Sequence, residues 1–372
     1  MTTPNSGHLL MSDVQKELAI TVGSSLYLSD PAVEALAKVT SASYYMSALY
    51  GRTNRVTLRY TISTNAVNFF LNMNSLAGYI AGKTDLILTI GSGVYVYNGR
   101  TPTTGWGDSG LYGGALNVHY TTDGDTLMIN NNGYIIGAGG NGGSGCDSLV
   151  SFSNPSYGGA ALCVSCPTVI DNTNPSAYIA GGGGGGGGGL NACGGGGAGG
   201  VVVPHAGYSE TSGNGGSFLL LNGGTIYGGK PNSLGAAGND GIYYLETNGS
   251  VPFGYDRGTA GAGGCVLPGV GGGFRANSYA LIGLGGGAGG GGGGDAGQNP
   301  GSGGSANNPG GAASGWAGGG GGGWGAKGGD SHYYNTTKFT NIGGAGGNAI
   351  VLNGNSVTFV NGDTSRIYGA IS

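Results

Sequence analysis

Two cysteines have the spacing that most resembles a chemical motif. Cys163 and Cys166 are separated by two residues, as in redox dithiols and in half of a structural zinc site. A zinc site needs two further ligands, which Cys146, Cys193 or His205 could supply only through tertiary contact. We therefore expect thiols that are buried or lie in loops, and no bound metal.

A second stretch has the outline of a nucleotide-binding loop. Residues 224–230 match the phosphate-loop pattern as far as Lys230, but Pro231 stands where a Ser or Thr would hold magnesium. The stretch therefore does not predict nucleotide binding, and no cofactor is expected.

The residues that hydrolytic enzymes use as nucleophile, base or acid show no recognisable motif in this sequence. The four histidines lie far apart and no G-x-S-x-G motif accompanies them. They are His8, His119, His205 and His332. Cleavage of a polysaccharide would use two carboxylates that face each other, whereas the eight acidic residues between positions 137 and 348 occur singly. Any two could meet in the fold, but nothing singles out a pair, and we expect a binding protein and not an enzyme.

The composition is dominated by glycine. Of 372 residues, 92 are glycine and only 8% are charged, yet 22 tyrosines are present. Aromatic content of this kind with so few charges is unlike a disordered tail. A net charge of −4 without a Lys/Arg cluster gives no electrostatic footprint for nucleic acid, so no nucleic-acid partner is expected.

Nothing in the sequence looks like a membrane element. The stretch MTTPNSGHLLMSDVQKEL lacks a basic region followed by an apolar one, and no run of about 18 apolar residues occurs. Five cysteines, an odd number, argue for reduced thiols and against a disulfide framework. We expect synthesis in a cytoplasm without a signal peptide, and no membrane insertion.

The first 55 residues contain three short helix-like starts, LLMSDVQKEL, LYLSDPAVEAL and YYMSALYGR. Ser12 and Gln15 have the capping-box spacing, and Asp30 before Pro31 suits an N-cap followed by proline at the first helical position. Residues 1–55 are predicted to be either a solvent-exposed helical extension or a docking segment. The repeated pattern favours docking, because so small a unit has too little core to stand alone.

Two β-hairpins are predicted after the helical segment. Asp85–Ile90 and Val94–Tyr97 flank a Gly-Ser-Gly turn and alternate in polarity. Leu116–Tyr120 followed by Thr126–Ile129 predicts a second hairpin, with Asp123 and Gly124 at its tight turn.

An apolar strand, a turn with Asn and Gly, and a second short strand recur in the sequence. The three copies begin at Leu127, Phe218 and Ile350. Such repetition suggests neighbouring rungs of one sheet or a small β-solenoid. We therefore predict a β-rich neck at residues 56–136, completed by residues 218–228 and 349–372.

The glycine-rich domain, residues 137–348, would then project from one end of this neck as two excursions, 137–217 and 229–348. Alone, glycine runs are flexible spacers, because ordering glycine costs more entropy than ordering any other residue. Runs of similar length could instead pack as polyglycine II helices, which have three residues per turn and backbone groups free to bond sideways. The alternation of runs with aromatic segments favours such a bundle, held by Trp316 and Trp324.

Loops at the end of the bundle would carry recognition. The segments between the runs are rich in Tyr, Asn, Ser and Gly, a mixture that resembles an antibody combining site. We predict receptor contacts at aromatic residues of these loops, although about half of such residues could instead pack beneath them. The candidate receptor-binding residues are Tyr157, Tyr178, Tyr208, Tyr243, Tyr244, Phe253, Tyr255, Phe274, Tyr279, Tyr333 and Tyr334.

Residues 137–348, including IAGGGGGGGGGLNACGGGGAGG and GLGGGAGGGGGGDAGQNPGSGG, resemble the glycine-rich distal tail-fibre adhesins of T-even-like bacteriophages. The resemblance implies a layered bundle of polyglycine II helices whose distal loops recognise an outer-membrane protein or lipopolysaccharide. The first 55 residues depart from that family and look like the short Ser-Asp helical segments of other tail proteins. The attachment partner is therefore left open between a trimeric fibre tip and the tail tip itself.

Together these features predict a mostly β or irregular protein with a helical docking segment, a β-rich neck and a polyglycine II bundle with distal loops. The predicted function is that of a receptor-binding adhesin on the virion, at a tail tip or distal tail fibre, bound to a tail or tail-fibre protein through residues 1–55. The alternatives are a tail-spike depolymerase and an ice-binding or structural glycine-rich protein. Flat ice-binding faces would favour repeated Thr or small side chains, whereas these loops are irregular and aromatic.

Overall fold

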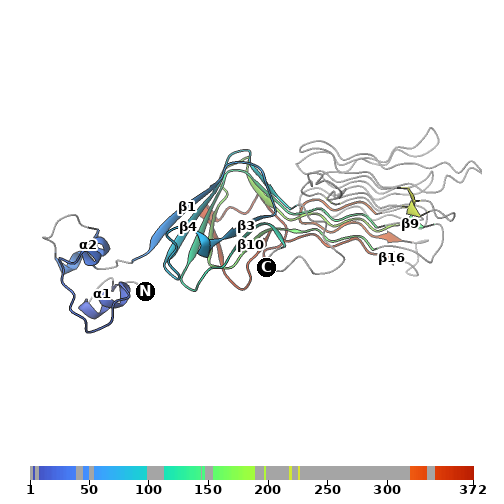
Figure 1. Cartoon of the computed structure of the whole chain (residues 1–372). Coiled ribbons are helices and arrows are strands. Elements are labelled where there is room, and N and C mark those ends of the chain that lie inside the picture. Colours follow the sequence, from blue (N-terminus) through green and yellow to red (C-terminus); the bar gives the residue numbers. More distant parts are fainter. Residues whose placement is uncertain are drawn as a thin grey trace, which may run out of the picture.

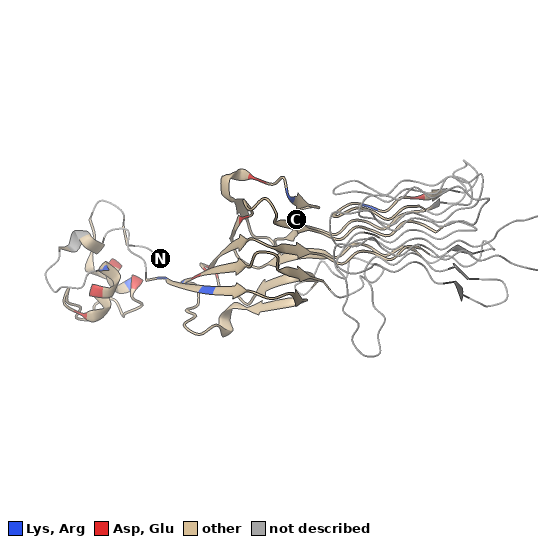
Figure 2. Ribbon diagram, turned by 90° about the horizontal axis from the view of Figure 1, so that it is seen from above, with Lys and Arg blue, Asp and Glu red and all other residues tan. Residues whose placement is uncertain are grey.

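The chain folds into a helical segment, a β-solenoid and a set of extended glycine-rich runs (Figure 1). The computed structural model describes residues 3–4, 8–38, 45–49, 54–98, 113–143, 145–146, 154–188, 197, 218–219, 225–226, 319–332 and 340–372. The helical segment lies at one end of the solenoid, and the glycine-rich runs leave from the opposite side (Figures 1 and 2). In the described ranges, no helix is long and apolar enough to span a bilayer.

The helical segment contains α1 (Met11–Glu17), α2 (Pro31–Ala37) and the 3-10 turn η1 (Met46–Leu49). These elements coincide with the three predicted helical starts, and Asp30 is the N-cap before Pro31 as expected. A small core joins them, consisting of Val14, Val33, Leu36, Ala37 and Leu49.

The capping box expected at Ser12 and Gln15 is wrong. The first turn of α1 is closed by Asp13, whose carboxylate accepts a hydrogen bond from the Leu10 N–H at 2.9 Å. The Gln15 side chain is buried and binds the Ser24 carbonyl and the Gly23 N–H, at 2.6 and 3.2 Å. The helix therefore starts two residues earlier than the polar spacing suggested, with Leu10 as its N-cap.

The solenoid consists of three parallel sheets that the chain visits in the repeating order A, B, C. Sheet A contains β1 (Val56–Ile62), β4 (Thr84–Ile90), β7 (Thr126–Asn131), β11 (Thr168–Asp171) and β18 (Val357–Phe359). Sheet B contains β2 (Ala66–Val67), β5 (Tyr95–Tyr97), β8 (Tyr134–Ile136), β12 (Tyr178–Ala180) and β19 (Ile367–Tyr368). Sheet C contains β3 (Phe69–Asn72), β6 (Gly114–His119), β10 (Ala160–Val164) and β17 (Ile350–Val351).

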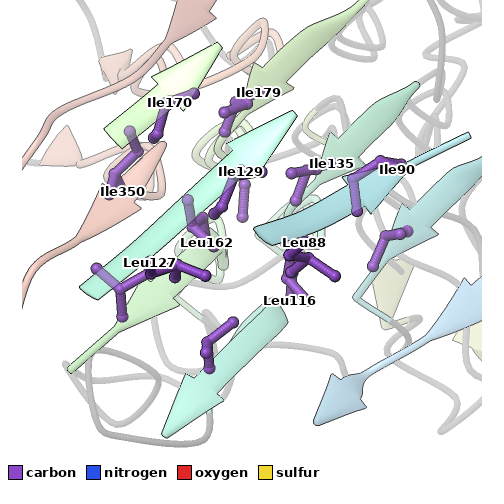
Figure 3. Packing of buried hydrophobic residues seen from close by; sticks show 14 of the residues in the cluster. Leu88, Ile90, Leu116, Leu127, Ile129, Ile135, Leu162, Ile170, Ile179 and Ile350 are labelled. Atoms are coloured by element: carbon purple, nitrogen blue, oxygen red, sulfur yellow. The ribbon is translucent and has the colours of Figure 1, made fainter. Parts of the chain in front are cut away.

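One continuous apolar core fills the solenoid (Figure 3). In each strand alternate side chains point inward, and parallel pairing places equivalent residues above one another, such as Leu88 on Ile129. The labelled residues of Figure 3 include Leu116 and Leu162 from sheet C, and all four of these side chains are fully buried. The short 3-10 turns η2 (Met73–Ser75) and η4 (Val360–Gly362) lie between strands of successive sheets.

Both predicted hairpins are wrong. Strands β4 and β5 lie in sheets A and B, and strands β6 and β7 lie in sheets C and A, so neither pair is hydrogen-bonded together. The turn glycine was nevertheless placed correctly, because Gly124 has a φ of +97°. A solenoid corner and a hairpin need the same residues with positive φ, and sequence spacing does not separate them.

The predicted rungs are partly correct. The copies that begin at Leu127 and Ile350 supply strands of the solenoid, but the two described strands of the copy that begins at Phe218 belong to another sheet. Strand β13 (Phe218–Leu219) pairs with β14 (Thr225–Ile226) and with β9 (Gly145–Cys146). Residues 160–180, expected within the glycine-rich domain, instead provide β10, β11 and β12.

Every long excursion leaves the solenoid at one corner, between sheets B and C. In the first turn of the solenoid Asn68 alone joins β2 to β3. In the following turns, the same corner contains residues 98–113, 137–159 and 181–349. The glycine-rich runs are therefore continuations of sheet B strands that return as sheet C strands.

The run at residues 181–188 is buried among other glycine-rich runs and is bonded to them through its backbone. Every carbonyl from Ala180 to Gly187 accepts an N–H from another segment. The donors, in order, are residues 137, 325, 347, 140, 322, 344, 143 and 319. The donors thus come in turn from three neighbouring segments, and each segment donates to every third carbonyl of this run.

Candidate receptor-binding and attachment surfaces

The free end of the glycine-rich runs lies farthest from the helical segment (Figure 1). Strands β15 (Ser331–His332) and β16 (Thr340–Asn341) form an antiparallel pair there. The Lys327 ammonium binds the Asp330 carboxylate at 2.7 Å, and the same carboxylate oxygen accepts the Gly343 N–H at 2.9 Å. These bonds fix the runs on either side of residues 333–339, the segment that contains two of the predicted contacts.

Most of the predicted contacts lie outside the described residues. These are Tyr208, Tyr243, Tyr244, Phe253, Tyr255, Phe274, Tyr279, Tyr333 and Tyr334. Tyr157 is described, and its side chain is 36% exposed beside the returning run that leads to β10.

Tyr178 does not lie in a loop, so its assignment as a receptor contact is wrong. It begins strand β12 of the solenoid and is only 5% exposed. Its ring packs against Tyr134, with 4.9 Å between ring centroids, and against Trp324 and Tyr368, each at 6.0 Å. Trp324, which comes from the glycine-rich part, covers the outer face of sheet B and thereby buries Tyr178.

These rings form an aromatic column on the outer face of sheet B. Tyr95 stacks on Tyr134 with centroids 4.5 Å apart, and Tyr134 continues to Tyr178. Burial raises the pKa of Tyr95 and of Tyr97. Trp324 is 2% exposed at the end of this column, so it holds the glycine-rich part against the solenoid, while Trp316, the other expected anchor, lies outside the described residues.

The two spaced cysteines are both buried and belong to different apolar clusters. Cys163 packs with Ala160 and Val351, whereas Cys166 belongs to the central solenoid core. Burial raises the pKa of the Cys166 thiol to about 12. Across the described ranges no group of three His, Cys, Asp or Glu residues could hold a metal ion.

A protein-family model decides the identity of the chain. The model, described as phage tail fibre adhesin Gp38, matches residues 56–268, more than half of the chain. The chain belongs to this family. The match begins at β1 and covers most of the solenoid and a large part of the glycine-rich domain.

Among solved structures, the adhesin is similar to the gp37–gp38 adhesin tip complex of the bacteriophage S16 long tail fibre. The identity is 17%, the alignment covers 99% of this chain and 100% of that chain, and the TM-score is 0.40. Comparison with curated proteins gave no match.

The opposite end of the adhesin carries exposed apolar side chains on its helical segment. They are Leu10, Val22, Tyr27 and Tyr45. Tyr45 is 85% exposed.

Charged residues join the helical segment to the solenoid. Glu17 is fully buried, and its carboxylate accepts the Asn54 N–H at 2.7 Å. The Lys83 ammonium lies 3.8 Å from that carboxylate and donates to the Glu17 carbonyl. Next along the chain, Arg55 donates to the Asp85 carboxylate, which lowers the pKa of Asp85. The joint between the two parts is therefore a bonded contact and not a free linker.

The solenoid has an aromatic patch near this joint that the sequence did not reveal. Phe70 stacks on His119 and meets Tyr120 edge-on, each with 5.8 Å between ring centroids. Phe70 is 38% and Tyr120 48% exposed, whereas His119 is buried and burial lowers its pKa. Strand alternation in Phe69–Asn72 indicates that one of the two phenylalanines faces outward, but it does not place Tyr120 beside it.

Proposed function

We propose that this tail fibre adhesin recognises a host bacterial surface receptor through loops at the free end of a polyglycine II bundle. The receptor would be an outer-membrane protein or lipopolysaccharide. The observation that carries the proposal is the arrangement of the described runs, which extend away from the solenoid. Two of them end on either side of residues 333–339, the segment that contains Tyr333 and Tyr334. Binding of this kind requires no catalytic group.

The hydrogen bonds of residues 181–187 support the polyglycine II assignment. Bonding to the same neighbour at every third residue fits a helix with three residues per turn and no internal hydrogen bonds. Hydrogen exchange can test it: amides of Gly137, Gly140 and Gly143 should exchange slowly, because each donates to a carbonyl of the buried run. Exchange at the rate of a spacer peptide would contradict the bundle.

The helical segment, residues 1–55, would bind a tail or tail-fibre protein. Its exposed apolar side chains and its small core support this role. In this division, the solenoid is the neck between the attachment segment and the receptor-binding domain, and the protein is carried on the virion at a tail tip or distal tail fibre.

Loop exchange tests receptor recognition. Residues 230–257 and 333–339 would be replaced by the matching segments of a related adhesin with another host, and adsorption of the resulting phage to both hosts would be measured. The solenoid corner 353–356 would be exchanged as the control. Transfer of host range with the loops, and not with the corner, is expected, whereas an unchanged host range after every loop exchange would contradict recognition by these loops.

A further inference from the structure

We infer that Asn361 is a site of spontaneous deamidation in the folded adhesin. The reactants are the Asn361 side-chain amide, the backbone nitrogen of Gly362 and water. The nitrogen forms a bond to the side-chain carbonyl carbon, the bond from that carbon to the amide nitrogen breaks, and ammonia leaves with the proton that the Gly362 nitrogen gives up. Water then opens the resulting succinimide ring at either carbonyl, which restores the Gly362 N–H and gives aspartate or isoaspartate. No oxidant or reductant takes part.

Asparagine is a chemically labile residue, and a following glycine leaves its own backbone nitrogen unshielded because it has no side chain. Four Asn-Gly pairs lie entirely within the described residues, at positions 132–133, 141–142, 353–354 and 361–362. Their sequences do not distinguish them as substrates, but their surroundings in the fold do.

Two of these pairs form nearly identical turns at corners of the solenoid. Asn353 and Gly354 have φ values of +50° and +84°, and Asn361 and Gly362 have φ values of +58° and +68°. All four residues are exposed, and a Cβ on either glycine would meet no atom within 4 Å. Backbone conformation and access to water are therefore alike in the two turns.

The hydrogen bonds of the two turns differ. The Asn353 side-chain amide donates to the Val164 carbonyl at 2.9 Å, and the Asn355 N–H closes the turn on the Leu352 carbonyl at 3.0 Å.

The turn of Asn361 is held less firmly. The Asp363 N–H lies 3.5 Å from the Val360 carbonyl, at the weak limit of a hydrogen bond. Within the described part of the chain, the Asn361 side chain makes no hydrogen bond. The reacting amide is therefore anchored at Asn353 and free to rotate at Asn361.

This difference controls the rate because the closed turn is not reactive. Asn361 has a ψ of 10°, and its backbone must rotate away from this value before the Gly362 nitrogen can reach the side-chain carbonyl carbon. Reaction therefore goes through a locally opened turn, whose population falls with every bond that holds the turn closed. One net hydrogen bond corresponds to about a fivefold difference in that population. We expect Asn361 to react at least about fivefold faster than Asn353.

The other two described pairs are held by the fold. The Gly133 N–H donates to the Asn131 side chain at 3.2 Å, and a Cβ on Gly133 would lie 2.3 Å from the Val94 carbonyl oxygen. The Asn141 carbonyl accepts the Ser156 N–H at 2.9 Å, in a segment that is bonded to the buried glycine run. Opening either pair would break bonds between segments, so both should react more slowly than Asn361.

The product changes the charge beside a contact between turns of the solenoid. Asp363, two residues beyond Asn361, binds Arg366 at 3.2 Å, and the Arg366 Nε donates to the Ala177 carbonyl at 3.1 Å. Deamidation adds a second carboxylate next to this pair. The isoaspartate product also lengthens the backbone within the turn.

Incubation of the purified full-length adhesin in mildly alkaline buffer, followed by peptide mapping with mass spectrometry, tests the inference. Asn361 should be converted first among the four described pairs, to both aspartate and isoaspartate. In urea, where the turns are absent, Asn353 and Asn361 should react at similar rates. Folded protein in which Asn353 reacts as fast as Asn361 would overturn the inference. So would conversion to aspartate alone, which indicates direct hydrolysis, or the same difference between the two sites in urea.

Matched glycine variants test the attacking nitrogen. Gly362→Ala adds a methyl group beside this nitrogen and should slow conversion of Asn361 by roughly tenfold, as the cost of crowding and of restricted rotation in the turn. Gly354→Ala puts the same group at the same kind of turn and should leave the rate at Asn361 unchanged. The rates are compared again in urea, where any difference in folded stability is removed. An unchanged rate at Asn361 in Gly362→Ala under both conditions would overturn the inference.

Discussion

Single glycines in the buried run are irreplaceable because of space and not because of conformation. A Cβ on Gly184 would lie 1.8 Å from the Gly344 carbonyl oxygen, and one on Gly182 would lie 1.7 Å from that of Ala138. Neither contact can be relieved by rotating a side chain, because both partners are backbone. The glycine content of this region thus follows from the closeness of the runs.

Alanine substitution measures this effect. Gly184→Ala should destabilise the glycine-rich part by about 3 kcal/mol or more, because overpacking forces the runs apart. Gly93→Ala is the control: its φ is +71° and no atom lies within 4 Å of the added Cβ, so it should cost only about 1–2 kcal/mol. Urea unfolding gives both values, and equal costs would contradict a close-packed run.

Cys166 provides a test of the core by pH. Because its folded pKa of about 12 exceeds the ordinary value of 9, the folded state keeps the proton that the unfolded state loses. Stability from this group is complete below pH 9 and is lost as the pH rises toward 12. We expect Cys166 to resist a thiol reagent at pH 8 until the protein unfolds, as followed by mass spectrometry; rapid labelling of the folded protein would contradict its burial.

Residue types alone do not reveal which aromatic residues are covered. Tyr178 has the same sequence surroundings as an exposed loop tyrosine, with Asn, Pro and Ser before it. It is buried because Trp324, far along the chain, packs over the outer face of its strand. The expectation that Trp324 acts as an anchor came from its apolar area, but its partner could not be inferred without the solenoid.

At the scale of elements, the aromatic column joins the solenoid to the glycine-rich runs. Trp324 packs on Tyr178 and Tyr368, in two different strands of sheet B. The described runs 181–188 and 319–330 consist mostly of glycine, so this contact supplies apolar burial that backbone hydrogen bonds cannot.

Replacing Trp324 should therefore loosen the runs and leave the solenoid intact. Trp324→Ala should cost about 3–5 kcal/mol, as for other buried large-to-small changes, and Trp324→Phe should cost less. Hydrogen exchange should speed up in residues 319–330 but not in the sheet A strands. Equal loss of protection in both parts would show that they do not unfold separately.

The secondary structure was partly predictable from local pattern. The helix starts, the alternating strands and the positive-φ glycine at 124 were all recognisable, because each depends on neighbouring residues. The pairing of the strands was not predictable, because a parallel solenoid pairs residues that are one full turn apart. Its corners also use the same turn residues as β-hairpins. The strand segments at 160–180 were overlooked for the same reason, since they lie between two glycine-rich stretches.

At the scale of the whole molecule, the solenoid is complete without its longest excursion. Val67, Asn68 and Phe69 cross the corner between sheets B and C in the first turn. Pairing along the sheets places Ala180 and Ile350 at the positions of Val67 and Phe69. One residue can therefore replace everything between them.

We expect a chain with residues 181–349 replaced by a single asparagine to fold into a β-rich solenoid. Its melting should be cooperative but at a lower temperature than that of the parent, because the aromatic column loses the cover of Trp324. Circular dichroism during heating measures this, and the shortened chain should not adsorb to host cells. Absence of a cooperative transition would mean that the glycine-rich part is needed to fold the solenoid.

The pairing of β10 with β17 also affects how the protein is made. Leu162 and Cys163 meet Ile350 and Val351, so this sheet stays incomplete until residues 350–351 have been synthesised. A chain that terminates before residue 350 lacks β17 and leaves β10 at the edge of sheet C. Such a chain thus differs from the finished protein in the strand that it exposes along sheet C.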